Sequence, residues 1–283
     1  MSNPSFDRFW NTLPALFLAV LFLCLSSGVV LLSQYRPFGD VFGNVEEIYG
    51  VIPFGFFIRR IHYFSGHLCV ILALMHVMYY FSMKKYSRSS VTLWSRLNCS
   101  LAVCFLLLLT GFILKADKEA YYAATVLKSL LMSLPLIGQT ASSVVVGQGE
   151  MFFFLPYLHH CFSLPLLLYL LLRRHIKQWF PEPVTLLATT VLLGAWCMLV
   201  PLPLPVMSAS LPEAVKGPWF FLGFQELLKH GPAFWVGIFT PLLCLGLFDV
   251  LPALKGRTER MAWWLVAGSM GGYALLAARM LAT

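Results

Sequence analysis

The sequence predicts an all-α integral membrane protein with seven transmembrane helices. The chain of 283 residues is 59% hydrophobic and only 11% charged, and its mean hydropathy is +0.78. Such a chain has too little polar surface to remain soluble. Its apolar residues also form runs of about the length that crosses a bilayer, at residues 11–33, 57–82, 97–115, 152–173, 184–203, 233–250 and 261–281.

The first run favours a retained span over a cleaved signal peptide. The apolar stretch from Leu13 to Leu32 is too long for a signal-peptide core and lacks a small-residue cleavage site. Charge in the connections then sets the orientation. With the N-terminus in the cytoplasm, the cytoplasmic side carries eleven Lys and Arg residues and four acidic ones, a net of +7, against +1 outside. Membrane topology therefore explains the overall charge of +8, and no nucleic-acid partner is expected.

The second run carries two histidines that share one helix face. His62 and His76 are fourteen residues apart, which is about 21 Å of rise and close to four whole turns of an α-helix. One imidazole therefore lies near each side of the bilayer. Imidazole in hydrocarbon is costly without a partner, so intramembrane histidines are candidates for function.

The fourth run repeats this pattern with His160 and His175, fifteen residues apart. Runs two and four cross the membrane in the same direction, so His62 pairs with His160 (the outer pair) and His76 with His175 (the inner pair). Facing imidazoles on diagonal helices of an up-down-up-down bundle predict bis-histidine coordination of two iron porphyrins, the arrangement of an electron carrier. The remaining histidines, His67, His159 and His230, fall outside this register and are interpreted as packing or interfacial residues.

Seven cysteines are spread through the apolar runs without a CxxC or CxxCH motif, which argues against covalent c-type haem, zinc ribbons and iron–sulfur ligation. The segment 177–183 is the expected boundary between a four-helix module at 1–180 and a three-helix module at 181–283. Two outer connections are long and aromatic, at 116–151 and 204–232. The first contains an expected amphipathic helix closed by Pro135 and Gly138. These loops fit either an interfacial aromatic belt or the walls of a pocket for a lipid-soluble substrate.

With these features together, the chain resembles the cytochrome b of the bc1 and b6f quinol-oxidising complexes, as a fused b6-like and subunit-IV-like chain. The resemblance rests on both histidine spacings, on Arg59 before His62, on the run Thr110-Gly111-Phe112-Ile113-Leu114 with Asp117, and on Gly217-Pro218-Trp219-Phe220 in place of the PEWY motif. It implies two haem b groups, with iron held by the four histidines, and quinone or quinol as substrate. It also implies that Gly28 and Gly111 make room beside the outer haem. Arg59, with Arg60, is expected to neutralise haem propionates.

The chain departs from the family at both ends of the bundle. Pro14 and Leu97 replace glycines near the inner haem, and Tyr79 replaces an arginine, so Arg174 or Lys177 is expected to compensate charge there. In the outer quinone pocket, Pro218 stands where the family has a proton-accepting glutamate. Quinol oxidation requires a proton acceptor within reach, and three carboxylates are candidates for this catalytic role: Glu226, Glu213 and Asp117.

The resemblance implies a membrane dihaem subunit of a quinol:acceptor oxidoreductase, catalytic only within its complex. An alternative is a haem-containing anchor and relay for an extracytoplasmic redox subunit, without quinol bifurcation; a non-redox seven-helix transporter or receptor is a third class. The implied partners are membrane lipid, quinone, and a Rieske iron–sulfur protein, multihaem cytochrome c or other redox subunit in a homo- or hetero-oligomeric complex. The expected location is the energy-transducing cytoplasmic membrane, with the C-terminus outside.

Overall fold

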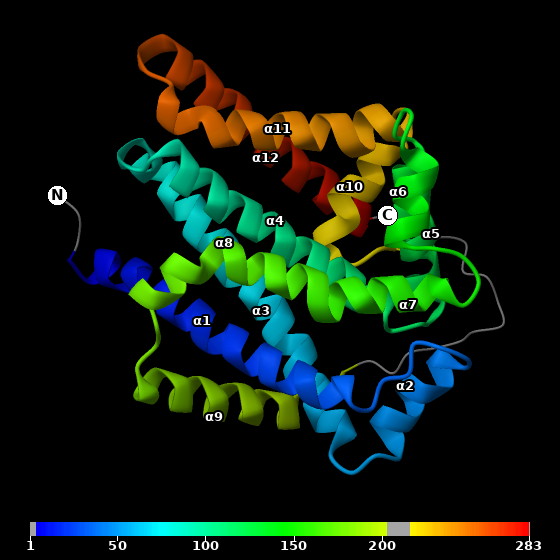
Figure 1. Ribbon diagram of the computed structural model, residues 1–283. Coiled ribbons are helices and arrows are strands. Elements are labelled where there is room, and N and C mark those ends of the chain that lie inside the picture. The colour runs from blue at the N-terminus through cyan, green and yellow to red at the C-terminus, as the bar shows by residue number, and fades with distance from the viewer. Residues whose placement is uncertain (1–3, 203–215, 283) are drawn as a thin grey trace. The chain divides into compact units, whose positions relative to one another are not determined.

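The computed structural model describes residues 4–202 and 216–282, and it places them in helices joined by short connections (Figure 1). No strand occurs in these two ranges. The all-α prediction is therefore confirmed for the part of the chain that is described. Glu213, one of the three candidate proton acceptors, lies outside these residues.

Within the described residues, six helical segments are long and apolar enough to cross a membrane. Four are single helices: α1 (Pro4–Leu32), α3 (Gly55–Ser82), α4 (Val91–Ile113) and α12 (Gly256–Ala282). The other two each contain a turn of π-helix. One runs through α7 (Met151–Leu158), η2 (His159–Ser163) and α8 (Leu164–Gln178); the other runs through η4 (Trp235–Phe239), α11 (Thr240–Val250) and η5 (Leu251–Ala253). The chain is a multi-pass membrane protein.

The remaining expected span corresponds to α9 (Pro183–Leu199), which has 17 residues. A helix of this length rises about 26 Å, slightly less than the roughly 30 Å hydrocarbon core of a bilayer. The seventh crossing therefore stays a prediction.

Shorter helices connect the spans. The amphipathic helix expected after α4 is present as α5 (Lys118–Met132), followed by α6 (Gly138–Val145). The 3-10 turns η1 (Lys85–Arg88) and η3 (Trp219–Phe221) and the short α10 (Leu222–Leu228) lie in other connections. The helix α2 (Val41–Gly50) is not among the elements expected from the sequence; Asp40 caps its N-terminus by accepting a hydrogen bond from the Gly43 amide.

Both π-turns occur two residues before a proline, Pro165 in one span and Pro241 in the other. Proline lacks an amide hydrogen, and its ring collides with the carbonyl four residues earlier in a regular α-helix. In η2 the Leu164 amide instead donates to the carbonyl of His159, five residues back. The π-turn takes up one additional residue. The fifteen residues from His160 to His175 therefore make about the same rotation around the helix axis as the fourteen residues from His62 to His76.

The described chain forms two compact units. The first consists of residues 1–85, 99–110 and 158–205, and the four paired histidines all belong to it. Within it α1 packs along α3, α9 contacts both of them, and α2 packs on α3 (Figure 1). Small and branched side chains such as Ala19, Val20 and Val70 are fully buried in this unit. Because α9 packs on α1 and α3, this unit extends past residue 180; the functional boundary at 180/181 stays a prediction.

The described part of the second unit consists of residues 86–98, 111–157 and 216–282. Within it α12 packs against α10 and α11, and α5 packs against α6. Three hydrogen bonds join η1 and the start of α4 to the α11–α12 corner: Trp94 Nε1 donates to the Phe248 carbonyl (2.8 Å), Asn98 Nδ2 to Asp249 Oδ1 (2.8 Å), and Tyr86 Oη to Glu259 Oε1 (2.9 Å). The connections near residues 86 and 259 therefore lie at one level of this unit.

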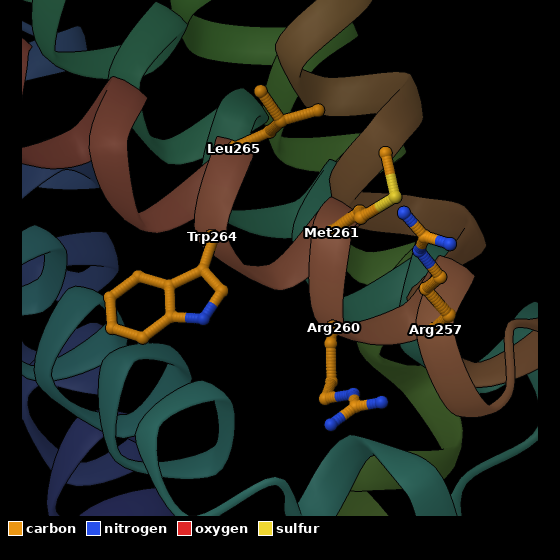
Figure 2. A pocket seen from close by; sticks show the side chains of 5 residues that line it. All are labelled: Arg257, Arg260, Met261, Trp264 and Leu265. Atoms are coloured by element: carbon orange, nitrogen blue, oxygen red, sulfur yellow. The ribbon is translucent and has the colours of Figure 1, made fainter.

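A hollow of about 380 Å³ lies along the first turns of α12 (Figure 2). Its lining combines two guanidinium groups with apolar side chains: Arg257, Arg260, Met261, Trp264 and Leu265. Trp264 is 69% exposed. Basic side chains followed by an exposed tryptophan are typical of the membrane–water interface. The hollow contains no residue of the histidine pairs, and we interpret it as lipid-facing surface.

Candidate functional site

The outer pair expected from the histidine spacings is formed in the structure. His62 comes from α3 and His160 from the π-turn η2, and both are half-buried. Their ring centroids are 6.0 Å apart with an interplanar angle of 81°.

Each imidazole of the outer pair is held by a backbone carbonyl. His62 Nδ1 lies 2.9 Å from the Cys24 carbonyl oxygen on α1, and His160 Nδ1 lies 3.1 Å from the Leu107 carbonyl on α4. A carbonyl can only accept, so Nδ1 carries the proton in both rings and Nε2 keeps its lone pair. Thr110 Oγ1 is a second neighbour of His160 Nδ1, at 3.1 Å. This is the arrangement typical of metal-ligating histidine, in which the second nitrogen is tied to a carbonyl.

The inner pair is also formed, with different surroundings. The ring centroids of His76 and His175 are 6.3 Å apart, with an interplanar angle of 59°. Tyr80 lies 4.7 Å from the His76 ring, and Trp179 lies 6.3 Å from the His175 ring. Among the described residues, His76 Nδ1 has no hydrogen-bond partner although it is buried. The inner imidazoles are therefore surrounded by aromatic rings, whereas the outer ones are fixed by carbonyls.

The spacing within each pair fits one metal ion between two imidazoles. Two metal–nitrogen bonds of about 2 Å, with about 1.1 Å from each nitrogen to its ring centre, place the centroids roughly 6 Å apart. The observed separations are 6.0 Å and 6.3 Å. A direct imidazole–imidazole hydrogen bond would bring the rings closer than this. The donor set suits an iron porphyrin with both axial positions filled.

Gly28 makes room for the outer pair. A β-carbon built at this position of α1 would lie 2.9 Å from His62 Cε1 and 3.3 Å from His62 Nδ1. Any larger residue would therefore push the imidazole away from its carbonyl partner. Gly111, the other glycine expected at this level, is half-buried on α4, one residue after Thr110.

The two arginines before His62 have different surroundings. Arg60 donates to the Cys197 carbonyl on α9 (3.1 Å) and to Tyr49 Oη on α2 (3.2 Å). It therefore ties α3 to two neighbouring helices. Arg59 places its guanidinium 5.6 Å from the centre of the Tyr49 ring. The propionate-binding role expected for both residues stays a prediction, and Arg59 is the better candidate because the hydrogen bonds of Arg60 serve helix packing.

The three histidines outside the pairs have local partners. His67 Nδ1 lies 2.9 Å from the Tyr63 carbonyl of its own helix, His159 Nδ1 lies 3.3 Å from Ser163 Oγ, and His230 Nε2 lies 3.5 Å from Glu226 Oε1. These contacts are those of packing or interfacial side chains.

Asp117, a candidate proton acceptor, caps a helix. Its side chain accepts a hydrogen bond from the Ala120 amide (3.0 Å) at the N-terminus of α5, and Lys115 Nζ lies 2.8 Å from its other oxygen. The carboxylate is 4% exposed. Its oxygens are thus engaged by an amide and an ammonium, a structural role that the sequence did not predict.

Glu226, another candidate proton acceptor, is the centre of a charged cluster. It is 4% exposed, with Lys229 Nζ at 2.6 Å from one oxygen and Arg279 Nε at 3.4 Å from the other. The hydrogen bond from Lys229, with the positive charges of Lys229 and Arg279, lowers the pKa of Glu226 below its ordinary value. Because Arg279 belongs to α12, the carboxylate also joins α10 to α12.

The sequence does not reveal the groups that hold the histidines. The carbonyls of Cys24 and Leu107 carry no side-chain signal, because any residue supplies a carbonyl. Thr110 stands out in the sequence only as part of a family motif. The π-turn could have been inferred from Pro165, five residues after His160.

The fold and the site define a class: a multi-pass helical membrane protein that presents imidazoles in facing pairs at two levels. Comparison with known proteins gives the particular family. A family model described as cytochrome b/b6/petB matches residues 1–181, more than half of the chain. The chain belongs to this cytochrome b family of the bc and b6f quinol oxidoreductase complexes, electron-transport proteins that carry haem b.

Individual relatives are distant. The chain is 29% identical over 119 residues to a cytochrome bc complex cytochrome b subunit of Chlorobaculum thiosulfatiphilum, a match that covers 42% of this chain and 28% of that protein. It is 26% identical over 169 residues to cytochrome b6 of Stigeoclonium helveticum, covering 56% of this chain and 78% of that protein. Among solved structures, a chain of a hyperthermophilic respiratory Complex III has a TM-score of 0.67 at 17% identity, covering 96% of this chain and 89% of that chain. The last match shows a shared fold.

Proposed function

We propose that this chain binds two haem b groups and moves electrons between membrane quinone and a redox partner subunit. The observation that carries the proposal is the pair of facing imidazoles, at 6.0 Å and 6.3 Å, found twice in one compact unit. His62 and His160 would hold the outer iron, and His76 and His175 the inner iron. Haem b supplies a one-electron iron couple when bound. The chain would be catalytic only within its complex.

The protein residues have separable tasks in this proposal. The Cys24 and Leu107 carbonyls fix the protonated Nδ1 of the outer ligands, so that both Nε2 atoms keep their lone pairs for iron. Gly28 keeps that arrangement free of a colliding β-carbon. Two histidines would hold each iron, which suits electron transfer and does not suit oxygen activation.

A haem count of the purified protein tests the proposal. The pyridine haemochrome assay should give two haem b per chain. His62→Ala or His160→Ala should remove the outer haem alone, and His76→Ala or His175→Ala the inner haem alone. One haem per unmodified chain, or none, would contradict it, and a colourless protein would favour the transporter or receptor class.

The contacts of the carboxylates favour the alternative role, a haem-containing anchor and relay that does not bifurcate quinol electrons. Pro218 cannot accept a proton, Asp117 caps α5, and Glu226 is ion-paired with Lys229 and Arg279. An ionised, cation-bound carboxylate is a weak base. Two of the three candidate proton acceptors are therefore already engaged, and Glu213 remains a candidate on sequence grounds alone.

Carboxamide variants separate the two roles. If quinol is oxidised at an outer site that uses Glu226, then Glu226→Gln should slow quinol-driven reduction of the outer haem while both haem spectra stay intact. Full activity in Glu226→Gln, Asp117→Asn and Glu213→Gln alike would support the relay. Copurifying subunits provide a second test: a Rieske protein supports bifurcation, and a multihaem cytochrome c supports the relay.

A further inference from the structure

The end of α3 beyond His76 carries a lysine held against aromatic rings. Lys85 Nζ donates a hydrogen bond of 2.6 Å to Tyr79 Oη. The same ammonium lies 4.3 Å from the centre of the Tyr79 ring and 5.8 Å from that of Tyr80. These three residues belong to the unit that holds the histidine pairs. The positive charge is thus fixed in place instead of extending into solvent.

The anchor of this lysine is itself rigid. Tyr79 is 5% exposed and stacks on Trp10 of α1, with ring centroids 4.5 Å apart and an interplanar angle of 3°. Tyr80, the next residue, lies 4.7 Å from the His76 ring. The cation is therefore connected to the inner pair through Tyr79 and its neighbour Tyr80.

Such a pair is suited to hold an anion. An ammonium carries three N–H donors, so it can hold more than one acceptor at a time. A carboxylate placed beside it would receive charge-assisted hydrogen bonds, which are about twice as strong as neutral ones. Haem b carries two propionate carboxylates.

We propose that Lys85, positioned by Tyr79, is the cation that binds a propionate carboxylate of the inner haem. The inference rests on the proposed function, since it requires a haem between His76 and His175. It replaces the expectation that Arg174 or Lys177 compensates charge there: those two side chains are exposed, whereas Lys85 is half-buried and tied to the inner pair.

Redox titration of the two haem spectra in the purified protein tests this. Lys85→Met removes the charge and keeps most of the length, so the inner midpoint potential should shift downward while the outer one stays unchanged. Lys85→Arg should restore it. Lys177→Met is the matched control, because it removes one exposed ammonium two residues after His175. In this variant the midpoint potential of the inner haem should stay near that of the unmodified protein.

The outcomes separate this inference from the function on which it rests. An unmodified protein without an inner haem overturns both. Two haems with an inner potential unmoved by Lys85→Met, or moved equally by Lys177→Met, overturn this inference alone. If Lys85→Met loses both haems through misfolding, Tyr79→Phe decides, since it keeps the ring on Trp10 and removes the hydroxyl. A lowered inner potential in that variant supports the proposal, and an unmoved one overturns it.

Discussion

Gly28 shows how one missing methyl group controls a ligand. A β-carbon there would stand 2.9 Å from His62 Cε1, so Gly28→Ala should displace the imidazole. Overpacking of this kind costs about 1–3 kcal/mol, or roughly 5- to 150-fold in retention of the outer haem. The pyridine haemochrome count and the spectrum of the outer haem measure how well this haem is retained.

Gly194→Ala on α9 is the matched control, since a β-carbon at this position would have Phe57 Cζ as its nearest neighbour, at 3.9 Å. Alanine is the better helix former by about 1 kcal/mol, so this control should keep both haems. Equal behaviour of the two variants would refute the role of Gly28.

The contacts of Glu226 predict how the stability of the folded protein changes at acid pH. Its folded-state pKa is lowered, chiefly by the hydrogen bond from Lys229, so the unfolded chain binds the proton more readily. The stabilisation from this carboxylate is therefore complete above its ordinary pKa of 4.5 and is lost as the pH falls through the lower folded value. Thermal unfolding in detergent should show Glu226→Gln less stable than the unmodified protein at neutral pH, with the difference shrinking below pH 4.5. A difference that does not change with pH would contradict this.

At the scale of elements, Pro165 sets the phase of a whole helix. Without it, the segment around His160 can return to regular α-helix, which turns about 100° per residue. Pro165→Ala should therefore misalign His160 with His62 and alter or remove the outer haem spectrum, while the inner haem persists.

The chain supplies a close control for this change. Pro241 follows the π-turn Trp235–Phe239 in the same way, and that turn contains no histidine. Pro241→Ala should leave both spectra unchanged. An intact outer haem in Pro165→Ala would mean that the π-turn persists without its proline.

The sequence was sufficient to predict the long apolar helices, and it was insufficient to predict α2 and the groups that hold the histidines in place. Hydrophobic run length predicted the spans because the bilayer imposes it, and fourteen- and fifteen-residue spacings predicted the facing histidines. The carbonyl partners Cys24 and Leu107 could not be predicted, since they depend on which helices become neighbours. The salt bridge from Lys229 to Glu226 spans three residues and was in principle readable, but the contribution of Arg279 depends on tertiary packing.

For the whole molecule, the hydrogen bond between Tyr86 and Glu259 bears on topology. It brings the α3–α4 connection to the start of α12, so both lie on one side of the membrane, as the charge bias requires. Epitope tags at Ser87 and Thr258 should be accessible from the cytoplasmic side, and a tag at the fully exposed Leu136 from the other side. If the tags at Ser87 and Thr258 were accessible only from the outer side, the proposed orientation would be refuted.

The unequal treatment of Nδ1 in the two pairs has an energetic consequence. Carbonyls that accept from Nδ1–H make the outer imidazoles more basic, which would stabilise the oxidised state of an iron held there, whereas the buried His76 Nδ1 has no such partner among the described residues. An electron would then be held less tightly at the outer level than at the inner one. In an energised membrane with a negative interior, inward movement of an electron costs about 2.3 kcal/mol per 100 mV for a full crossing. The roughly 21 Å between the pairs covers about two thirds of the hydrocarbon core. The backbone carbonyls of Cys24 and Leu107 would thus help an electron to move inward against the membrane potential.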